Sequence, residues 1–415
     1  MSYTVLTIAP TSFFADYGCH VRIWEEVKTL RNLGHRVVMT TYHNGDNMPG
    51  LDIRRSWDVP WIKRAMVGSS RHKIYLDMAL LWRTVRVALE IKPDIIHAHL
   101  HEGALIGTIV SRLLGVPLIF DYQGSLTGEM LDHGFLRRDS GLHQPLRLLE
   151  HVLNRLPDAV ITSSYNAATT LHRAWGFPRE HLYTVPDSVN TERFRPFDGS
   201  QPWEEERRRL RTELGIPHDR RVVAYIGLLA PYQGTDKLIE AARIVVGQRP
   251  DIHFLIMGYP DVTSYRALAE SLGVGDHVTL PGRIMYRDLH AYLALGDIAV
   301  APKMSETEGA GKISNYLAMG LPVVAFDTPV SHEMLGNVGR YARYGDPQSL
   351  AEEMIALLDD PREMEILSAA GRARAIREHS WELGALQIQA IYDRALALRA
   401  GRPLPPVPTV LEGAS

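Results

Sequence analysis

The first half of the chain alternates short apolar runs with longer segments in which apolar residues recur at helical spacing. Apolar runs of this length predict strands, and the periodic segments predict helices between them. The predicted strands are residues 3–9, 36–41, 94–97, 117–121 and 159–163, and the predicted helices are residues 21–33, 76–91 and 103–114. Because buried strands separated by helices pair in parallel, this half predicts a parallel sheet covered on both faces.

The alternation stops near residue 185 and then resumes. Residues 185–196 are rich in turn-forming residues, which is typical of a linker. A predicted helix of interleaved Glu and Arg follows at 203–214. The second series of predicted strands is 222–226, 253–257, 277–280, 298–301 and 322–325, with helices at 235–247, 265–272 and 312–319. Since 415 residues are too many for one core of the usual size, we expect two doubly wound α/β domains with a cleft between them.

Composition narrows the class of protein. Apolar residues at 45% and charged residues at 22% are typical of globular proteins, and we find no charge-free stretch of spanning length. The single cysteine, Cys19, excludes an internal disulfide and gives too few thiolates for a structural zinc site. The first residues run directly into a predicted strand, so we expect a cytoplasmic protein. A net charge of -3 argues against a nucleic-acid binder.

Residues 61–73 mix apolar and basic side chains. This pattern fits a surface loop, which we favour, and it also fits a weak peripheral contact with an anionic surface at the inner face of a membrane.

Ligands of open α/β sheets bind beyond the carboxyl ends of the strands, so candidate residues come directly after strands. After the first strand, Gly18 precedes a helix and lets a ligand approach the backbone. Further on, His97, His99 and His101 share one face if the strand at 94–97 continues. This spacing suits a metal, yet no carboxylate completes a convincing site, so we predict no metal. We expect at least one of the histidines to contact acceptor or donor, with ordinary packing as the alternative.

Two strand ends in the second half suit a sugar nucleotide. After residue 226, Gly227 and Gly234 flank a loop whose amides are able to cradle phosphate. The run 301–312 places carboxylates, glycines and lysines at a strand-to-helix junction, where carboxylates bind hydroxyls and cations meet a diphosphate. Its candidate donor-binding residues are Lys303, Glu306, Gly309, Gly311 and Lys312, with Arg283 as a competing cation.

These segments together resemble glycosyltransferase family four. The resemblance rests on the segments 94–99, 186–196, 227–234 and 308–325 and covers nearly the whole chain. It implies the GT-B fold, with two Rossmann-like domains, residues 1–186 on the acceptor side and residues 187–380 for the donor. It further implies that a helix over 381–400 returns to the first domain, ahead of a flexible tail at 401–415.

The same resemblance implies a retaining, metal-independent transfer of a sugar from a nucleotide-diphosphate donor, without a cofactor. His99 matches a family histidine that lies at the transferred sugar, so the candidate catalytic residues are His99, Glu308 and Asn315. His97 and His101 are expected on the acceptor side.

The chain also departs from the family in its second half. The differing positions are Thr307 and Asn315, where the family has glutamates, and Leu228 and Gln233, where it has an arginine and a lysine. Asn315 is still able to bond a ribose hydroxyl, and Gln233 stays a candidate for donor binding. We expect Lys312, assisted by Lys303, to supply the missing positive charge. The alternative is an inactive relative that binds a nucleotide sugar or a partner, and the acceptor is left open among a glycan, a lipid-linked molecule and a small molecule.

Overall fold

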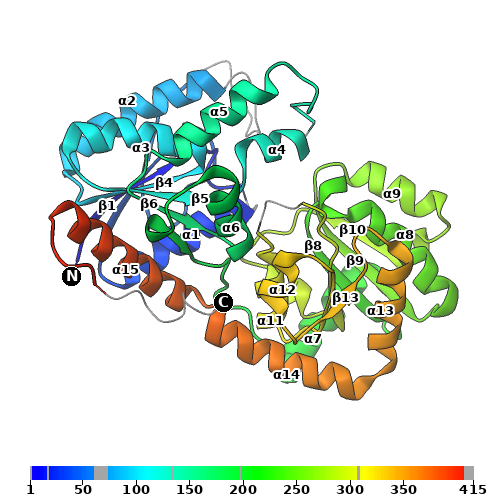
Figure 1. Cartoon of the computed structure of the whole chain (residues 1–415). Helices are drawn as coiled ribbons and strands as arrows, with labels where there is room; N and C mark the ends of the chain where they lie inside the picture. Colours follow the sequence, from blue (N-terminus) through cyan, green and yellow to red (C-terminus); the bar gives the residue numbers. More distant parts are fainter. Residues whose placement is uncertain are drawn as a thin grey trace. The chain divides into compact units, whose positions relative to one another are not determined.

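The computed structural model describes residues 2–15, 18–59, 73–132, 134–196, 198–305 and 309–405. The chain divides into two α/β units (Figure 1). The first unit takes in residues up to Pro186 and those from Trp381 onward, and the second takes in most of the residues from Asp187 to Ser380. Each unit has its own sheet and its own buried core.

Seven parallel strands form the sheet of the first unit, in the order β3-β2-β1-β4-β5-β6-β7. They are β1 (Thr4–Ala9), β2 (Arg36–Thr41), β3 (Asp52–Arg55), β4 (Ile95–His99), β5 (Leu118–Tyr122), β6 (Ala159–Thr162) and β7 (Leu182–Thr184). All five strands predicted in this half are confirmed. The edge strands β3 and β7 were not predicted, because they are only four and three residues long and have no apolar run.

Helices cover both faces of this sheet. They are α1 (Gly18–Asn32), α2 (Lys73–Ile91), α3 (Leu100–Leu114), α4 (Leu126–Asp132), α5 (His143–Asn154), α6 (Tyr165–Trp175) and α15 (Trp381–Arg399), with a 3-10 turn at Arg179–His181. Leu80 of α2 and Val110 of α3 pack in one core with Ile96 of β4. The next residue, His97, points to the opposite face. There α1 packs against α15, whose Tyr392 contacts His97.

Six parallel strands form the sheet of the second unit, in the order β10-β9-β8-β11-β12-β13. They are β8 (Arg221–Leu228), β9 (Ile252–Tyr259), β10 (Val278–Gly282), β11 (Ile298–Ala301), β12 (Val323–Phe326) and β13 (Arg340–Ala342). The five strands predicted here are confirmed, and the three-residue β13 was missed. Phe254 and Val300 pack with Leu238 and Leu350 from two helices, which gives this unit a core of its own.

The helices of the second unit flank this sheet. They are α7 (Gln201–Glu213), α8 (Thr235–Gln248), α9 (Val262–Ser271), α10 (Leu289–Leu293), α11 (Lys312–Ala318), α12 (Pro329–Leu335), α13 (Pro347–Asp359) and α14 (Pro361–Glu378), with 3-10 turns at Pro231–Gln233 and Gly275–His277. Within the described parts of the chain, no helix combines the length and the apolar character needed to cross a membrane.

Each sheet contains a point at which strand order reverses. In the first sheet β1 adjoins β4, and in the second β8 adjoins β11, so the chain leaves the two neighbouring strands in opposite directions. Ligands of doubly wound sheets bind beyond the carboxyl ends of the strands at this point. The four segments involved follow Ala9, His99, Leu228 and Ala301.

Candidate functional site

Two stacked histidines end β4 in the first unit. The rings of His97 and His99 have centroids 4.7 Å apart, because alternate residues of a strand share a face. Both side chains are buried. His99 Nδ1 lies 3.0 Å from Asp121 Oδ2 on β5, and His97 Nδ1 lies 2.7 Å from the hydroxyl of Tyr392. One nitrogen of each ring is therefore fixed by a neighbouring element.

A buried guanidinium holds the carboxylate beside His99. Arg22 of α1 donates from Nη2 to Asp121 Oδ1 at 2.8 Å and from Nε to Asp121 Oδ2 at 3.0 Å. Burial raises the pKa of Asp121, but Arg22 and His99 outweigh that effect and hold the pKa below its usual range. Asp121 therefore stays ionised and only accepts hydrogen bonds, so the Nδ1 of His99 carries the hydrogen.

His97 is neutral in its buried position. Burial and the nearby His99 lower the pKa of His97 to about 3. The Nε2 atoms of both histidines are buried and have no hydrogen-bond partner within the described residues.

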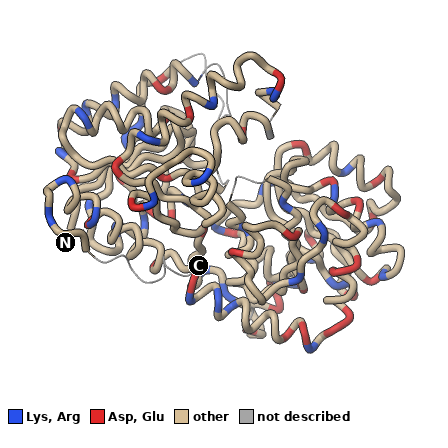
Figure 2. The backbone as a smooth tube through the Cα atoms, in the orientation of Figure 1, with Lys and Arg blue, Asp and Glu red and all other residues tan. Residues whose placement is uncertain are grey.

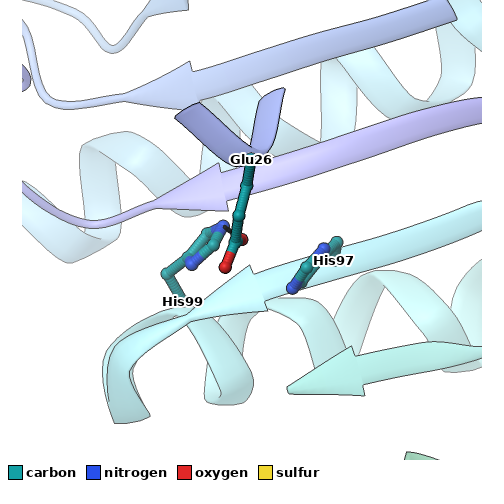
Figure 3. A group of neighbouring side chains, drawn as sticks. All are labelled: Glu26, His97 and His99. Carbon is teal, nitrogen blue, oxygen red and sulfur yellow. Dashed lines mark ion pairs between the residues drawn. The ribbon is translucent and has the colours of Figure 1, made fainter. Parts of the chain in front are cut away.

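Glu26 of α1 joins the two histidines. Its carboxylate and one nitrogen of each ring lie within 4.8 Å of one another (Figure 3). Two histidines and a carboxylate suit zinc, and the sequence pattern did not reveal that Glu26 lies beside the histidines. Arg22 Nε, however, lies 3.0 Å from Glu26 Oε1. Because a divalent ion on Glu26 would meet this positive charge, we interpret Glu26 as the ion-pair partner of Arg22 and not as a metal ligand.

His101 does not join this cluster, which corrects the prediction that it shares a face with His97 and His99. The strand ends at His99, and Leu100, with φ at 59°, begins α3. The His101 ring packs edge-on against Phe120, and its Nε2 lies 3.1 Å from Asn154 Oδ1. Burial lowers its pKa. In this structure His101 is a core histidine.

Gly18 begins α1, and a Cβ added there would meet no heavy atom within 4 Å. The predicted open approach at Gly18 thus has room among the described atoms. The adjoining Cys19 is half-buried, and burial raises the pKa of its thiol. A protonated thiol is a poor nucleophile, so Cys19 acts as a packed residue.

Two glycines permit close contacts at the carboxyl ends of β8 and β11, one with the backbone and one with a side chain. At Gly234 φ is 73°, and a Cβ would lie 1.8 Å from the carbonyl oxygen of Pro302. At Gly227 φ is 154°, and a Cβ would lie 2.7 Å from Lys312 Nζ. The carbonyl of Tyr232 also accepts bonds from two amides of residues 304–305. The loop after β8 and the segment after β11 are therefore linked, as only glycine permits at these positions.

Lys312 places an ammonium group in this same loop. It begins α11, and its Nζ lies 3.0 Å from Gln233 Oε1 and 3.3 Å from the hydroxyl of Tyr225. The Nζ also lies 4.4 Å from the centre of the Tyr225 ring. Burial raises the pKa of Tyr225, so its hydroxyl is neutral. The structure thus brings together Gly227, Gln233, Gly234 and Lys312.

Gly311 and Ser314 lie beside Asp187. A Cβ on Gly311 would be 3.2 Å from Asp187 Oδ2, and Ser314 Oγ donates to the Asp187 carbonyl at 2.6 Å. Asn315 Nδ2 lies 3.3 Å from the carbonyl oxygen of Gly311. Its side chain is therefore bonded to the backbone one turn earlier.

The remaining predicted donor residues are less closely grouped. Arg283 is exposed after β10, with its guanidinium 5.7 Å from the ring centre of Tyr259. Lys303 and Gly309 are half-buried. Glu306 and Glu308 lie outside the described residues, so their predicted roles stay predictions.

Sequence reasoning missed Arg22, Glu26 and Asp121 in the first unit and Tyr225 in the second. A signal was present for the first two, because they stand four residues apart among apolar residues and so share the buried face of a helix. Asp121 lies one residue before the carboxyl end of the buried strand β5, where functional residues of such sheets are often found. Tyr225 gave no such signal, because a tyrosine is common within a strand.

Comparisons with known proteins agree with this geometry. Residues 17–187 match the family model of the glycosyl transferase 4-like domain, and residues 206–374 match that of glycosyl transferases group 1. A D-inositol 3-phosphate glycosyltransferase of Thermobispora bispora is 26% identical over 91% of this chain and 90% of its own. A sulfoquinovosyl transferase of Arabidopsis thaliana is 24% identical over 92% of this chain and 72% of its own.

Solved structures share the fold. A sucrose-phosphate synthase from Thermosynechococcus elongatus has a TM-score of 0.78 at 19% identity, covering 95% of this chain and 99% of its own. Anabaena HepE, solved in complex with UDP and glucose, has a TM-score of 0.75 at 18% identity, covering 93% of this chain and 98% of its own. With a family match in each unit and this likeness of fold, the chain is an enzyme and belongs to the GT-B glycosyltransferases that resemble family four.

Proposed function

We propose that the chain transfers a sugar, with retention of its anomeric configuration, from a nucleotide-diphosphate donor held in the loop after β8. The observation that carries this proposal is the position of Lys312. Its Nζ is held by Gln233 Oε1 at 3.0 Å and occupies the space that a Cβ on Gly227 would take. An ammonium group at the carboxyl ends of two neighbouring parallel strands suits a diphosphate.

The departures from the family support the same proposal. Position 233, where the family has a lysine, carries a glutamine in this chain, and that glutamine holds the ammonium of Lys312. A positive charge is therefore present next to Gln233 although the usual lysine is missing. The charge needed to compensate a buried diphosphate comes from the first residue of α11.

For the reaction itself, we propose same-face substitution without a protein nucleophile. The bond from the sugar C1 to the diphosphate oxygen breaks, the acceptor oxygen bonds C1 on the same face, and its proton passes to the leaving diphosphate. His99 contacts the transferred sugar, with Arg22 and Asp121 holding its ring in place. We propose that no divalent metal and no further cofactor take part.

The donor proposal draws on the relatives. Anabaena HepE was solved with UDP-glucose, and a relative from Corynebacterium glutamicum, 35% identical over 49% of this chain and 53% of its own, is named as GDP-mannose-dependent. We therefore propose a nucleoside-diphosphate hexose, transferred to a glycan, a lipid-linked molecule or a small molecule.

The location of the enzyme is also a proposal. We place it in the cytoplasm, in keeping with one cysteine in 415 residues. Of the segment 61–73, for which a membrane contact was considered, only Lys73 is among the described residues, and it pairs with Glu102 at 2.7 Å.

Calorimetry with UDP, GDP and ADP tests the proposal at its first step. One of the three is expected to bind, and the matching sugar nucleotide is expected to release nucleoside diphosphate in the presence of an acceptor. The anomeric configuration of the product, read by NMR, tests retention, and turnover in chelator tests metal independence. Absence of binding by all three nucleotides would contradict the proposal.

A further inference from the structure

The outer surface of three helices in the first unit exposes large apolar side chains. We define this apolar face by Met78 and Trp82 of α2, Ile109 and Leu113 of α3, and Leu148 and Val152 of α5. Each is at least 45% exposed, and Met78 and Leu148 reach 65%. The two residues on each helix are four apart, so they lie above one another on the outward side.

The three helices adjoin one another, so their exposed residues form one surface. The helix α3 packs against both α2 and α5 (Figure 1). The opposite sides of α2 and α3 are buried in the core of the unit through Leu80 and Val110. The exposed side chains are therefore additional to those that fold the unit. Large exposed apolar patches mark surfaces that bind a partner or a membrane.

Aromatic and basic side chains accompany the apolar face. The ring of Trp57, itself 53% exposed, lies 6.1 Å from that of Trp82, centroid to centroid. Arg86 follows Trp82 by one turn, and Arg112 and Arg147 are exposed on α3 and α5. Figure 2 shows basic residues along these helices. Tryptophan and arginine next to aliphatic side chains fit the boundary between lipid headgroups and acyl chains.

The acidic side chains of the same helices are paired with basic residues or are at least partly buried. Glu102 lies 2.7 Å from Lys73, and Glu90 lies 3.6 Å from Arg54. Glu150 is fully buried. Asp77 accepts a bond from the hydroxyl of Tyr42, and burial raises its pKa to about 6. The surface charge around the apolar face is therefore mainly that of arginine, which complements an anionic surface.

We propose that the apolar face docks the first unit onto an anionic membrane surface. Trp82, Met78 and their neighbours enter the headgroup region, and the arginines lie on lipid phosphates. The described helices include none that could cross a membrane, so the contact is peripheral. The inference uses the first unit alone and is independent of the donor chemistry proposed above.

Vesicle co-sedimentation of the full chain tests this proposal. Phosphatidylcholine vesicles that contain phosphatidylglycerol are expected to bind the chain, and vesicles of phosphatidylcholine alone are expected to bind it weakly. The double variant Met78→Ser, Trp82→Ser should bind the anionic vesicles at least about tenfold more weakly, because two large apolar groups no longer leave water. Arg86→Glu with Arg112→Glu should weaken binding by about tenfold or more.

The matched control replaces Ile366 and Ile376 of α14 in the second unit, which are 57% and 50% exposed, with serine. This variant should bind like the parent chain. The proposal is overturned if the parent ignores anionic vesicles at low ionic strength, or if the Met78 and Trp82 variant binds as well as the control. It is also overturned if light scattering shows a dimer that this variant abolishes while vesicles bind neither protein, which would assign the face to a second copy.

Nucleoside-diphosphate calorimetry on the same samples separates the two proposals. The surface variants should bind nucleotide like the parent. A parent chain that binds vesicles but no nucleotide would contradict the proposed function and leave the membrane inference in place.

Discussion

In the first unit the candidate site consists of buried side chains that hold one another, whereas in the second it consists largely of backbone that glycines bring close together. Arg22, Asp121 and His99 are nearly inaccessible and mutually bonded. Around Gly227 and Gly234, Lys312 contributes the ammonium charge. This difference predicts that substitutions in the first site mainly lower stability, because they leave buried charges uncompensated. Substitutions in the second site should mainly weaken ligand binding.

The largest effect is expected for Arg22→Leu. Removing the guanidinium leaves the buried Asp121 and Glu26 carboxylates without the positive charge that compensates them, so the free energy of unfolding should fall by about 3–5 kcal/mol. Chemical denaturation measures this change. Arg31→Leu, at an exposed position near the end of the same helix, is the control and should change stability little. Equal losses in the two variants would contradict the account of the first site.

In the second unit, Lys312→Ala should weaken nucleoside-diphosphate binding by about ten- to a hundredfold, because a bond between charged groups is lost. Calorimetry should show unchanged affinity for the bare nucleoside and a nearly unchanged melting temperature. Lys237→Ala on α8 is the control, because that lysine pairs with Glu240 at 3.0 Å and has no contact with Gln233 among those described. If Lys312→Ala and the parent chain bind the diphosphate alike, the comparison between the two sites fails.

His99→Asn tests whether the first site also serves the reaction. The amide can still donate to Asp121, so stability should change little, while loss of Nε2 should lower turnover by about tenfold. His101→Asn is the contrasting variant, because its ring packs in the core, and it should lower the melting temperature without changing turnover per folded molecule. The reverse result would make His99 the structural residue of the two.

Counted per pH unit, the smallest effect is that of pH on stability. Because the pKa of His97 is lowered from 6.5 to about 3, the unfolded chain binds a proton in this window that the folded chain does not. Stability therefore falls as pH falls from 6.5 toward 3, by at most about 1.4 kcal/mol per pH unit. His97→Gln should flatten the profile by that amount. His253→Gln in the second unit should flatten it over a narrower window, since burial lowers the pKa of His253 only to about 4. Profiles that run parallel to that of the parent would contradict the assignment.

The sequence predicted the fold well because its strands are buried on both faces. Runs such as those of β11 and β12 are apolar throughout, and glycine stands at points where the backbone must turn or approach another segment. Local patterns also indicated His99 and Lys312. They failed at His101, because the change from strand to helix at Leu100 depends on a single residue with positive φ.

Local sequence patterns could not predict which residues these side chains contact. Arg22 meets Asp121 across 99 positions of sequence, and Lys312 meets Gln233 across 79. Such pairs form only when strand order places their elements together. The charged residues on the buried face of the helix predicted at 21–33 indicated that partners exist, because a buried charge requires a partner.

The helix α15 gives the first unit a particular order of assembly. Its Tyr392 bonds His97 and its Asp393 accepts a bond from Tyr3, so segments 295 and 390 residues apart in sequence belong to one unit. During synthesis the ribosome delivers the whole second unit before this helix emerges. Domains generally fold as units while the chain grows. The second unit can therefore complete its folding first, and the first unit closes only after α15 has been synthesised.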